Sequence, residues 1–367
     1  MAHTLVTYLV SRPRYSTAPS STQVVRVPGR GVIGLTGPDA TKFLQGLMAN
    51  NVEPVGSGDI PGTYGAFLTP QGRVDREAFV FHYHPDRLGD GPKEPGFLLD
   101  LPQDGVVPIM ALLTKYRLRS KITIQDLSSA FTIWSRWSTI SNDPAPPSSL
   151  QTPYLSLVDP RAPDMGHRLL LPSSPESPWA EGKEEEVCGS AYVIRRILRG
   201  VCEGPMDIWS GTSLPFDVNM DYAHAVDYRK GCYVGQELVS RTYHTGVIRK
   251  RMVPVQLIPL SSDHGSYDPT KPPILDPSIQ LVFPPPQTDI RKMTSRPGKT
   301  RSAGRWAGGI HNIGLALLRL EDIRERQPLT LTMVDGQDML LSPYIPSWWP
   351  ISKDLSPSSS LSESKRS

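Results

Sequence analysis

A single thiol stands in the stretch of the sequence that is best suited to chemistry. Cys232 follows Arg229, Lys230 and Gly231, and Gly235 comes three residues later. Glycine permits backbone geometry and close approach that a side chain would forbid, so we expect Cys232 on a tight turn. The adjacent cationic side chains could favour the thiolate, which is the nucleophilic and metal-binding form of cysteine. Cys232 therefore has two interpretations, a functional thiol or a small buried hydrophobic residue.

The other two cysteines, Cys188 and Cys202, do not complete a recognisable site with Cys232. Three is an odd number and no C-x-x-C pair is present, which argues against a disulfide framework and a self-contained zinc site. A reducing compartment fits this pattern. Because a lone cysteine cannot complete a metal site by itself, we predict no stably bound metal. Cys232 could act only as a transient ligand, with further ligands from another chain.

The composition argues against two classes of binding partner. The formal net charge is +3 and the basic residues are scattered, whereas nucleic-acid-binding proteins concentrate Lys and Arg on one face. No apolar run approaches the roughly 18 to 20 residues that are needed to span a bilayer. We therefore expect neither nucleic-acid binding nor membrane insertion.

The chain is long enough for more than one domain. At 367 residues, two or three domains are expected, because single hydrophobic cores rarely grow that large. Residues 1–38 contain no Asp or Glu but four arginines, which predicts an organelle transit peptide, placed at residues 1–23. Segments near 141–152 and 172–186 are rich in Pro, Ser or charge and are expected to be loops, and residues 346–367 a disordered tail.

The hydrophobic pattern of the first half of the chain predicts a mixture of strands and helices, which is an α+β arrangement. Residues 64–68 and 74–81 are expected to be strands joined by a turn, because Pro70 is followed by Gly72. Residues 106–118 are expected to form a helix.

The pattern changes beyond residue 249, where apolar residues alternate in short runs that are typical of strands. Such runs within residues 249–345 predict a small β-barrel-like domain. Residues 261–303 interrupt it with two clusters of proline, and we expect this segment to be a flexible insertion.

The stretch around Cys232 is similar to the signature of a known family. Residues 230–237 read K-G-C-x-x-G-Q-E and resemble the YgfZ-like branch of the glycine-cleavage T-protein (aminomethyltransferase-like) superfamily, whose mitochondrial member is an iron-sulfur cluster assembly factor. The resemblance covers most of residues 24–320, including residues 34–46, 64–73 and 200–215. Its motif residues here are Lys230, Gly231, Cys232, Tyr233, Gly235, Gln236, Glu237 and Arg241.

The resemblance implies a fold and a ligand. The fold is a cloverleaf of mixed α/β lobes around a central channel, formed by residues 24–248, with the β-barrel domain after it. The ligand is tetrahydrofolate, bound in that channel. Glu203 is the candidate pterin anchor, since a carboxylate can accept hydrogen bonds from the amino and N–H groups of the ring. Tyr64, Asp75 and Arg76 are the other residues expected at the folate site.

The resemblance also implies a function in the mitochondrial matrix. The protein is expected to be an accessory factor for maturation of 4Fe-4S enzymes such as aconitase and the lipoyl and biotin synthases. Its expected partners are A-type iron-sulfur carrier proteins, and it is expected to be a monomer. The role of Cys232 stays open between a transient cluster or iron ligand, a redox centre and a contact to a partner.

One position departs from the working transferase. The T-protein has its catalytic Asp where a gap-free alignment places Arg76, and a guanidinium cannot act as a general base. Asp75 lies one step along the strand and should point to the opposite face. We therefore expect no classical turnover. The alternatives are a folate-dependent aminomethyltransferase in which Asp75 or Glu77 takes over, and a binding module that inherited only the fold.

Overall fold

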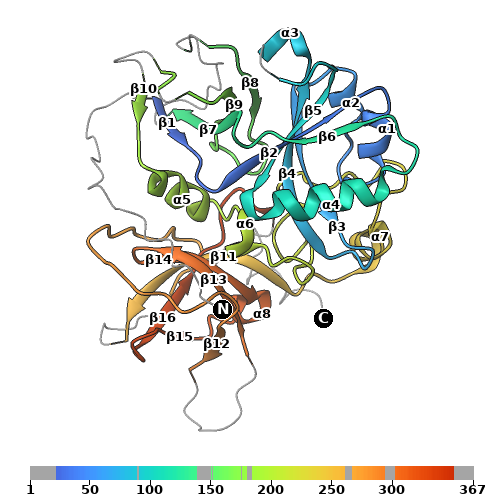
Figure 1. Cartoon of the computed structure of the whole chain (residues 1–367). Helices are drawn as coiled ribbons and strands as arrows, with labels where there is room; N and C mark the ends of the chain where they lie inside the picture. The colour runs from blue at the N-terminus through green and yellow to red at the C-terminus, as the bar shows by residue number, and fades with distance from the viewer. Residues whose placement is uncertain are drawn as a thin grey trace.

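The computed structural model describes most of the chain between residues 22 and 350. The described ranges are 22–88, 91–138, 150, 152–174, 176–179, 184–260, 267–293 and 302–350. Their strands form two five-stranded sheets and one closed barrel, which helices connect and cover (Figure 1). The predicted α+β class with a carboxy-terminal barrel is confirmed.

The first lobe is built on an antiparallel sheet with the strand order β3-β4-β5-β2-β6. Its strands are β2 (Arg30–Thr36), β3 (Gly62–Leu68), β4 (Val74–Tyr83), β5 (Gly96–Pro102) and β6 (Thr123–Asp126). Its helices are α1 (Ala40–Gln45), α2 (Glu53–Gly56), α3 (Pro85–Leu88), η1 (Gln103–Gly105) and α4 (Val106–Arg117). Apolar side chains of α1, α2 and α4 pack on one face of the sheet, and Figure 1 shows α4 lying across it.

The second lobe is a sheet with the order β10-β1-β7-β9-β8. Its strands are β1 (Thr22–Arg26), β7 (Phe131–Ser138), β8 (Leu155–Val158), β9 (His167–Pro172) and β10 (Glu184–Glu186). The chain turns at Gly29, whose φ of 67° is in the left-handed region, so β1 and β2 belong to different sheets. Helix α5 (Gly189–Leu198) lies between this sheet and the barrel.

The barrel closes in the order β11-β14-β13-β12-β15-β16. Its elements are β11 (Lys250–Pro259), β12 (Asp289–Lys292), β13 (Gly304–Ile310), β14 (Ile313–Arg319), α8 (Leu320–Arg324), β15 (Leu329–Thr332) and β16 (Asp338–Pro343). Between α5 and the barrel, the chain forms α6 (Gly204–Asp207) and α7 (Gln236–Thr245).

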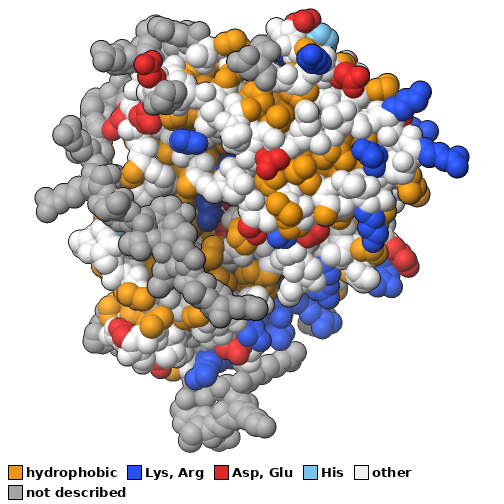
Figure 2. Space-filling model, viewed as in Figure 1, with side chains coloured by type: hydrophobic (Ala, Val, Ile, Leu, Met, Phe, Trp, Pro, Cys, Tyr) orange, Lys and Arg blue, Asp and Glu red, His pale blue; other side chains and the backbone are white. Residues whose placement is uncertain are grey.

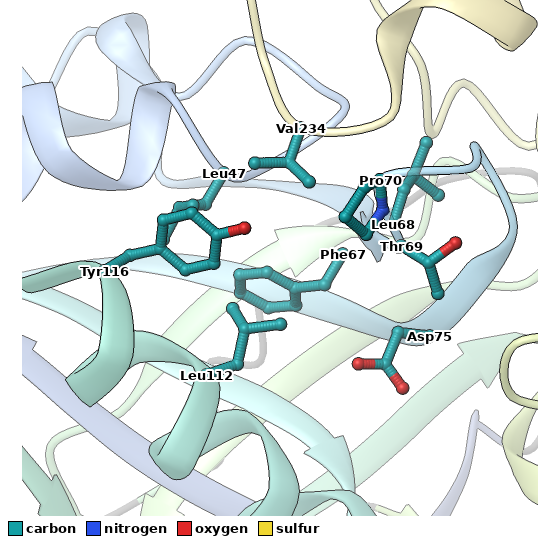
Figure 3. A pocket seen from close by; sticks show the side chains of 9 residues that line it. All are labelled: Leu47, Phe67, Leu68, Thr69, Pro70, Asp75, Leu112, Tyr116 and Val234. Atoms are coloured by element: carbon teal, nitrogen blue, oxygen red, sulfur yellow. The ribbon is translucent and has the colours of Figure 1, made fainter.

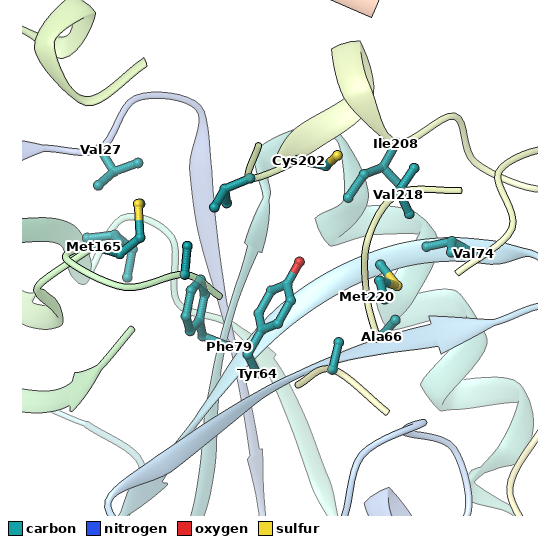
Figure 4. Close-up of a cluster of buried hydrophobic side chains, with 14 of the residues drawn as sticks. Val27, Tyr64, Ala66, Val74, Phe79, Met165, Cys202, Ile208, Val218 and Met220 are labelled. Atoms are coloured by element: carbon teal, nitrogen blue, oxygen red, sulfur yellow. The ribbon is translucent and has the colours of Figure 1, made fainter. Parts of the chain in front are cut away.

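A shared core joins the two lobes to the barrel. Figure 4 shows part of it, with Tyr64 and Phe79 of the first lobe and Met165 of the second. Cys202 lies in the same core, and Met252 contributes to it from the barrel. Because these side chains are buried together, the three parts pack as one body around the centre.

The expected flexible insertion is partly wrong. Within residues 261–303, the segment 267–293 is described and supplies β12 to the closed barrel. Phe283 stacks on Trp306 with ring centroids 5.3 Å apart, which ties the Pro-rich segment to the barrel core. The sequence pattern did not predict β12, because a strand of four residues shows little periodicity.

Three other boundaries also need correction. Residues Glu184–Glu186 of the expected loop 172–186 form β10, which pairs with β1. Trp349, in the expected tail, is 1% exposed and packs in the barrel core. Thr22 begins β1, so the last two residues of the expected transit peptide are part of a sheet. Residues 1–21, 141–149 and 351–367 of these expectations lie outside the described residues.

Candidate functional site

The loop that carries Cys232 is attached to the first lobe through the side chain of Lys230. The ammonium nitrogen of Lys230 donates hydrogen bonds to the carbonyl oxygens of Gln45 and Met48, both at 2.7 Å, and of Asn50 at 2.9 Å. It also lies 5.2 Å from the centre of the Tyr233 ring. Lys230 therefore points into the protein, and its charge is shared among carbonyl groups.

Burial also shifts the pKa of this amine. It lowers the pKa of Lys230 to about 8, although nearby Asp227 and Glu53 oppose the shift. Two backbone bonds add to the attachment, from Val234 N–H to the Gly46 carbonyl at 3.2 Å and from Asp227 N–H to the Ala49 carbonyl at 3.1 Å. These contacts hold the loop against residues 45–50 of the first lobe.

Cys232 is exposed, unlike the other two cysteines. Cys202 is buried in the shared core, and burial raises the pKa of its thiol well above the usual value. Cys188 is half-buried at the start of α5 and contacts the Ser190 hydroxyl at 2.7 Å. Of the three thiols, only that of Cys232 is presented on the surface.

The two glycines of the motif have different surroundings. Gly235 has a φ of 83°, and a Cβ there would lie 2.5 Å from the Thr69 carbonyl oxygen. Gly72 faces it in the β3–β4 turn, where a Cβ would lie 3.0 Å from the Gly235 carbonyl oxygen. Gly231 has no described atom within 4 Å of such a Cβ. The expected close approach therefore exists at Gly235 and not at Gly231.

The remaining motif residues lie in the first turns of α7 and in the loop just before it. Tyr233 is buried, with 8% of its surface exposed. Gln236 begins α7 and is half-buried, whereas Glu237 and Arg241 are exposed on the helix. Tyr233 thus supports the loop, while the exposed side chains of α7 lie on the surface with Cys232.

A β-bulge changes the expected orientation of Asp75. Phe67 pairs with Arg76 and Leu68 pairs with Val74, so Asp75 is an extra residue in β4. Asp75 and Arg76 then lie on the same side of the sheet and form an ion pair at 3.2 Å. The expectation that Asp75 points to the opposite face is wrong, because the strand alternation is interrupted at the bulge.

Glu77, the next acidic residue of β4, faces the centre of the protein. It is buried and accepts hydrogen bonds from both terminal nitrogens of Arg30, at 2.5 and 3.3 Å. Arg30 also donates to Asp100 at 2.6 Å. Glu77 and Asp100 therefore share the Arg30 guanidinium, and Asp100 also pairs with Arg168 at 2.7 Å.

Glu203 and Tyr64, two of the expected folate-site residues, come together in this central region. The Glu203 carboxylate accepts hydrogen bonds from Arg161 at 2.6 Å and from the Tyr192 hydroxyl at 2.5 Å. The guanidinium of Arg161 lies 5.4 Å from the centre of the Tyr64 ring. Asp75 and Arg76 lie apart from this cluster, on the side of the sheet that faces α4.

Arginines keep Glu203 charged although it is buried. Burial alone would raise the pKa of Glu203, but Arg168, Arg161, Arg30 and Arg196 hold it well below its usual value. Of these, Arg161 and Arg168 donate hydrogen bonds to Glu203, and like the bond from the Tyr192 hydroxyl they reach only Oε2. Sequence reasoning missed these arginines, because their spacing along the chain carries no motif.

The described residues were also compared with the requirements of a metal site and of a membrane-spanning helix. Within the described ranges, no three His, Cys, Asp or Glu side chains are grouped closely enough to hold a metal ion. Among the described helices, none combines the length and the apolar character that crossing a membrane requires.

The overall architecture is shared with a solved protein structure. The crystal structure of the glycine cleavage system aminomethyltransferase T from Bartonella henselae superposes with a TM-score of 0.59, over 89% of this chain and 85% of that one. The two sequences are 12% identical, so this likeness establishes the fold alone. The chain therefore has the aminomethyltransferase T fold, and residues 249–351 match the family described as CAF17, C-terminal beta-barrel domain.

Sequence relatives then define the family. A protein of Mycosarcoma maydis named "Iron-sulfur cluster assembly factor IBA57 homolog, mitochondrial" is 36% identical over 356 residues, which cover 90% of this chain and 86% of that protein. The protein of the same name from Aspergillus clavatus is 39% identical over 83% of this chain and 72% of that protein. The chain belongs to this family of mitochondrial iron-sulfur cluster assembly factors. The predicted family of mitochondrial iron-sulfur cluster assembly factors and the mitochondrial location are thereby confirmed.

Proposed function

We propose that this protein is an accessory factor for the maturation of 4Fe-4S enzymes in the mitochondrial matrix, and that Cys232 is its working thiol. A-type carrier proteins are the proposed partners, and aconitase and the lipoyl and biotin synthases the proposed clients. The observation that carries the proposal is the exposure of Cys232 on a loop that Lys230 holds in place. A fixed, accessible thiol is suited to contact a cluster that another protein carries.

The proposed role of Cys232 is that of a transient iron ligand. Iron-sulfur clusters are held mainly by several cysteine thiolates, and the described part of the chain has no group of ligands that could complete such a site. Cys188 and Cys202 are half-buried and buried. The other ligands would therefore come from the partner, and cluster contact would be limited to the complex.

We also propose that the region around Glu203 binds a reduced folate. The side chain is 8% exposed, and its recorded hydrogen bonds leave Oε1 as an acceptor for the amino and N–H groups of a pterin. The low pKa of Glu203 keeps this acceptor charged. These features fit the pterin head group, and a bound reduced folate would supply a carrier for one-carbon units.

The alternative of a folate-dependent aminomethyltransferase is less well supported. A general base must be free to take a proton from its substrate. Asp75 is engaged by Arg76 and by the Ser210 hydroxyl at 2.8 Å, and Glu77 is paired with Arg30. Neither carboxylate is a free base in this arrangement.

The thiol is tested by Cys232→Ser in cells that lack the native protein. The change keeps the size of the side chain but removes its affinity for iron. We expect normal melting temperature and folate binding, together with reduced activity of aconitase and of the lipoyl and biotin synthases. Cys188→Ser and Cys202→Ser are the controls and should affect stability at most. Normal client activity with stably expressed Cys232→Ser would show that the proposed thiol chemistry is wrong.

The transferase alternative is tested with the purified protein. We expect tetrahydrofolate to bind, as measured by calorimetry, without transfer of a one-carbon unit from an aminomethylated carrier protein. Tetrahydrofolate-dependent turnover that Asp75→Asn abolishes would favour the transferase instead.

A further inference from the structure

A pocket lies beside the loop that carries Cys232, where α4 meets the β3–β4 turn (Figure 3). Leu112 and Tyr116 of α4 form one wall, Phe67 lies at the base, and Val234 of the loop lies opposite. Asp75 adds a carboxylate at one end. The pocket is thus mainly apolar, with one anionic group.

The size of the pocket favours a protein side chain as its occupant. Its volume is about 190 Å³, whereas sites for drug-sized ligands are typically about 300–1,000 Å³. An apolar cavity of about 150 Å³ is known to accept a benzene ring. One aromatic or large aliphatic side chain would therefore fill it, and a folate would not fit.

The pocket is close to the thiol. Val234 lines it, and Cys232 is two residues earlier in the same loop. Consecutive residues span at most about 3.6 Å each, so the Cα atoms of these two residues are within about 7 Å of each other. A protein anchored in the pocket would reach the thiol with its neighbouring residues.

The end of α4 and the turn after it, next to the pocket wall, are basic, whereas Asp104 before the helix is exposed and pairs with Arg76. The residues from 105 to 125 include no Asp or Glu, and their cations Lys115, Arg117, Arg119 and Lys121 are all exposed. Lys42 of α1 is exposed as well. Figure 2 shows Lys and Arg side chains gathered around the end of α4. The complementary surface of a partner would be acidic.

We propose that this pocket is the docking site for an acidic protein partner, which inserts one large apolar side chain and thereby places its own iron ligands at Cys232. The inference rests on the proposed function and identifies where the A-type carrier binds. A basic and apolar helix face is also compatible with an anionic membrane. The pocket favours a protein, because a lipid surface needs no recess for a single side chain.

The test is binding of a purified A-type carrier to the full chain, measured by calorimetry at low and high salt. Leu112→Glu puts a carboxylate into the pocket wall, and we expect at least a tenfold loss of affinity. Val107→Glu is the matched control, because Val107 is 74% exposed on the same helix and does not line the pocket. We expect Val107→Glu to change affinity less than threefold, and wild-type affinity to fall as salt screens the basic surface.

Pro70→Glu is a second variant that introduces a carboxylate into the pocket. Pro70 lines the pocket from an exposed turn, so its replacement leaves the hydrophobic core unchanged. We expect the same loss of affinity with an unchanged melting temperature. Cys232→Ser should still dock but should not receive a cluster.

Each opposite result has a distinct meaning. Folded Leu112→Glu and Pro70→Glu variants that bind the carrier normally would overturn the docking site and leave the proposed function intact. A wild-type protein that does not bind the carrier would overturn the proposed partner, and this inference with it. Binding to cardiolipin-containing vesicles that both variants abolish, with carrier binding unchanged, would assign the pocket to a membrane surface instead.

Discussion

The side-chain nitrogen of Lys230 lies 2.7 Å from the carbonyl oxygen of Met48, and this contact ties the thiol-bearing loop to the first lobe. The two residues are 182 positions apart in the sequence. The same nitrogen bonds two more carbonyl groups of the segment 45–50. The position of Cys232 on the surface therefore depends on a half-buried amine two residues before it.

Lys230→Met should loosen the loop. The change removes three charge-assisted hydrogen bonds and leaves their carbonyl groups without this donor, at a cost of about 1.5–3 kcal/mol in the free energy of unfolding. Hydrogen exchange of the amides of residues 231–235 should become faster, and client activity should fall. Lys271→Met, at an exposed position, is the control. Unchanged exchange in the loop would show that other contacts hold it.

Gly235→Ala and Gly231→Ala should differ sharply. The left-handed φ of Gly235 and the nearby Thr69 carbonyl oxygen disfavour any side chain, so alanine there should cost about 1–3 kcal/mol of stability. Gly231→Ala should change the melting temperature little, because its Cβ would meet no described atom. Chemical denaturation of both variants measures the difference. Equal destabilisation by the two changes would contradict the difference between the surroundings of Gly235 and Gly231.

Arg30→Met should destabilise the protein strongly. It would leave Glu77 buried without its hydrogen-bonded cation, while Asp100 would keep its pair with Arg168, and breaking a buried pair costs about 3–5 kcal/mol. Arg305→Met is the matched control, because Arg305 and its partner Asp289 are each 47% exposed, and such pairs contribute less than about 1 kcal/mol. Denaturant unfolding of the two variants provides the measurement. Similar losses would show that the central network contributes no more than a surface pair.

Asp217→Asn should stabilise the protein at neutral pH. Burial raises the pKa of Asp217 to about 6, although Lys250, Arg73 and Arg251 oppose the shift. The folded state therefore holds this proton between about pH 4 and pH 6 while the unfolded state has lost it, so stability falls as the pH rises through this window.

Asp217 is fully ionised in the folded protein by about pH 7. Its ionisation then lowers the free energy of unfolding by about 2–3 kcal/mol. Asp217→Asn should thus raise the melting temperature at pH 7 and leave it almost unchanged at pH 4. Asp335→Asn, in an exposed turn, is the control and should have little effect at either pH. An equal effect of Asp217→Asn at both pH values would contradict the assigned titration.

Part of the fold and of the site could be predicted from local sequence. The strands before and after Gly72 and the main barrel strands are short apolar runs bounded by turn residues, a pattern that depends only on near neighbours. The motif at residues 230–237 identified the family without any knowledge of contacts. Strand β12 was missed because its pairing with β13 and β15 stabilises it more than its own pattern indicates.

The arrangement of the site depends on the tertiary structure. The sequence alone determined that a thiol follows Lys230, but only the fold decided that the amine points inward to segment 45–50. Likewise, the bulge at Asp75 arises from the register of β4 against β3, and Glu203 meets Arg161 across 42 residues of chain. The physical reason is that a side chain's direction and charge state depend on partners that are distant in sequence, and no local pattern records them.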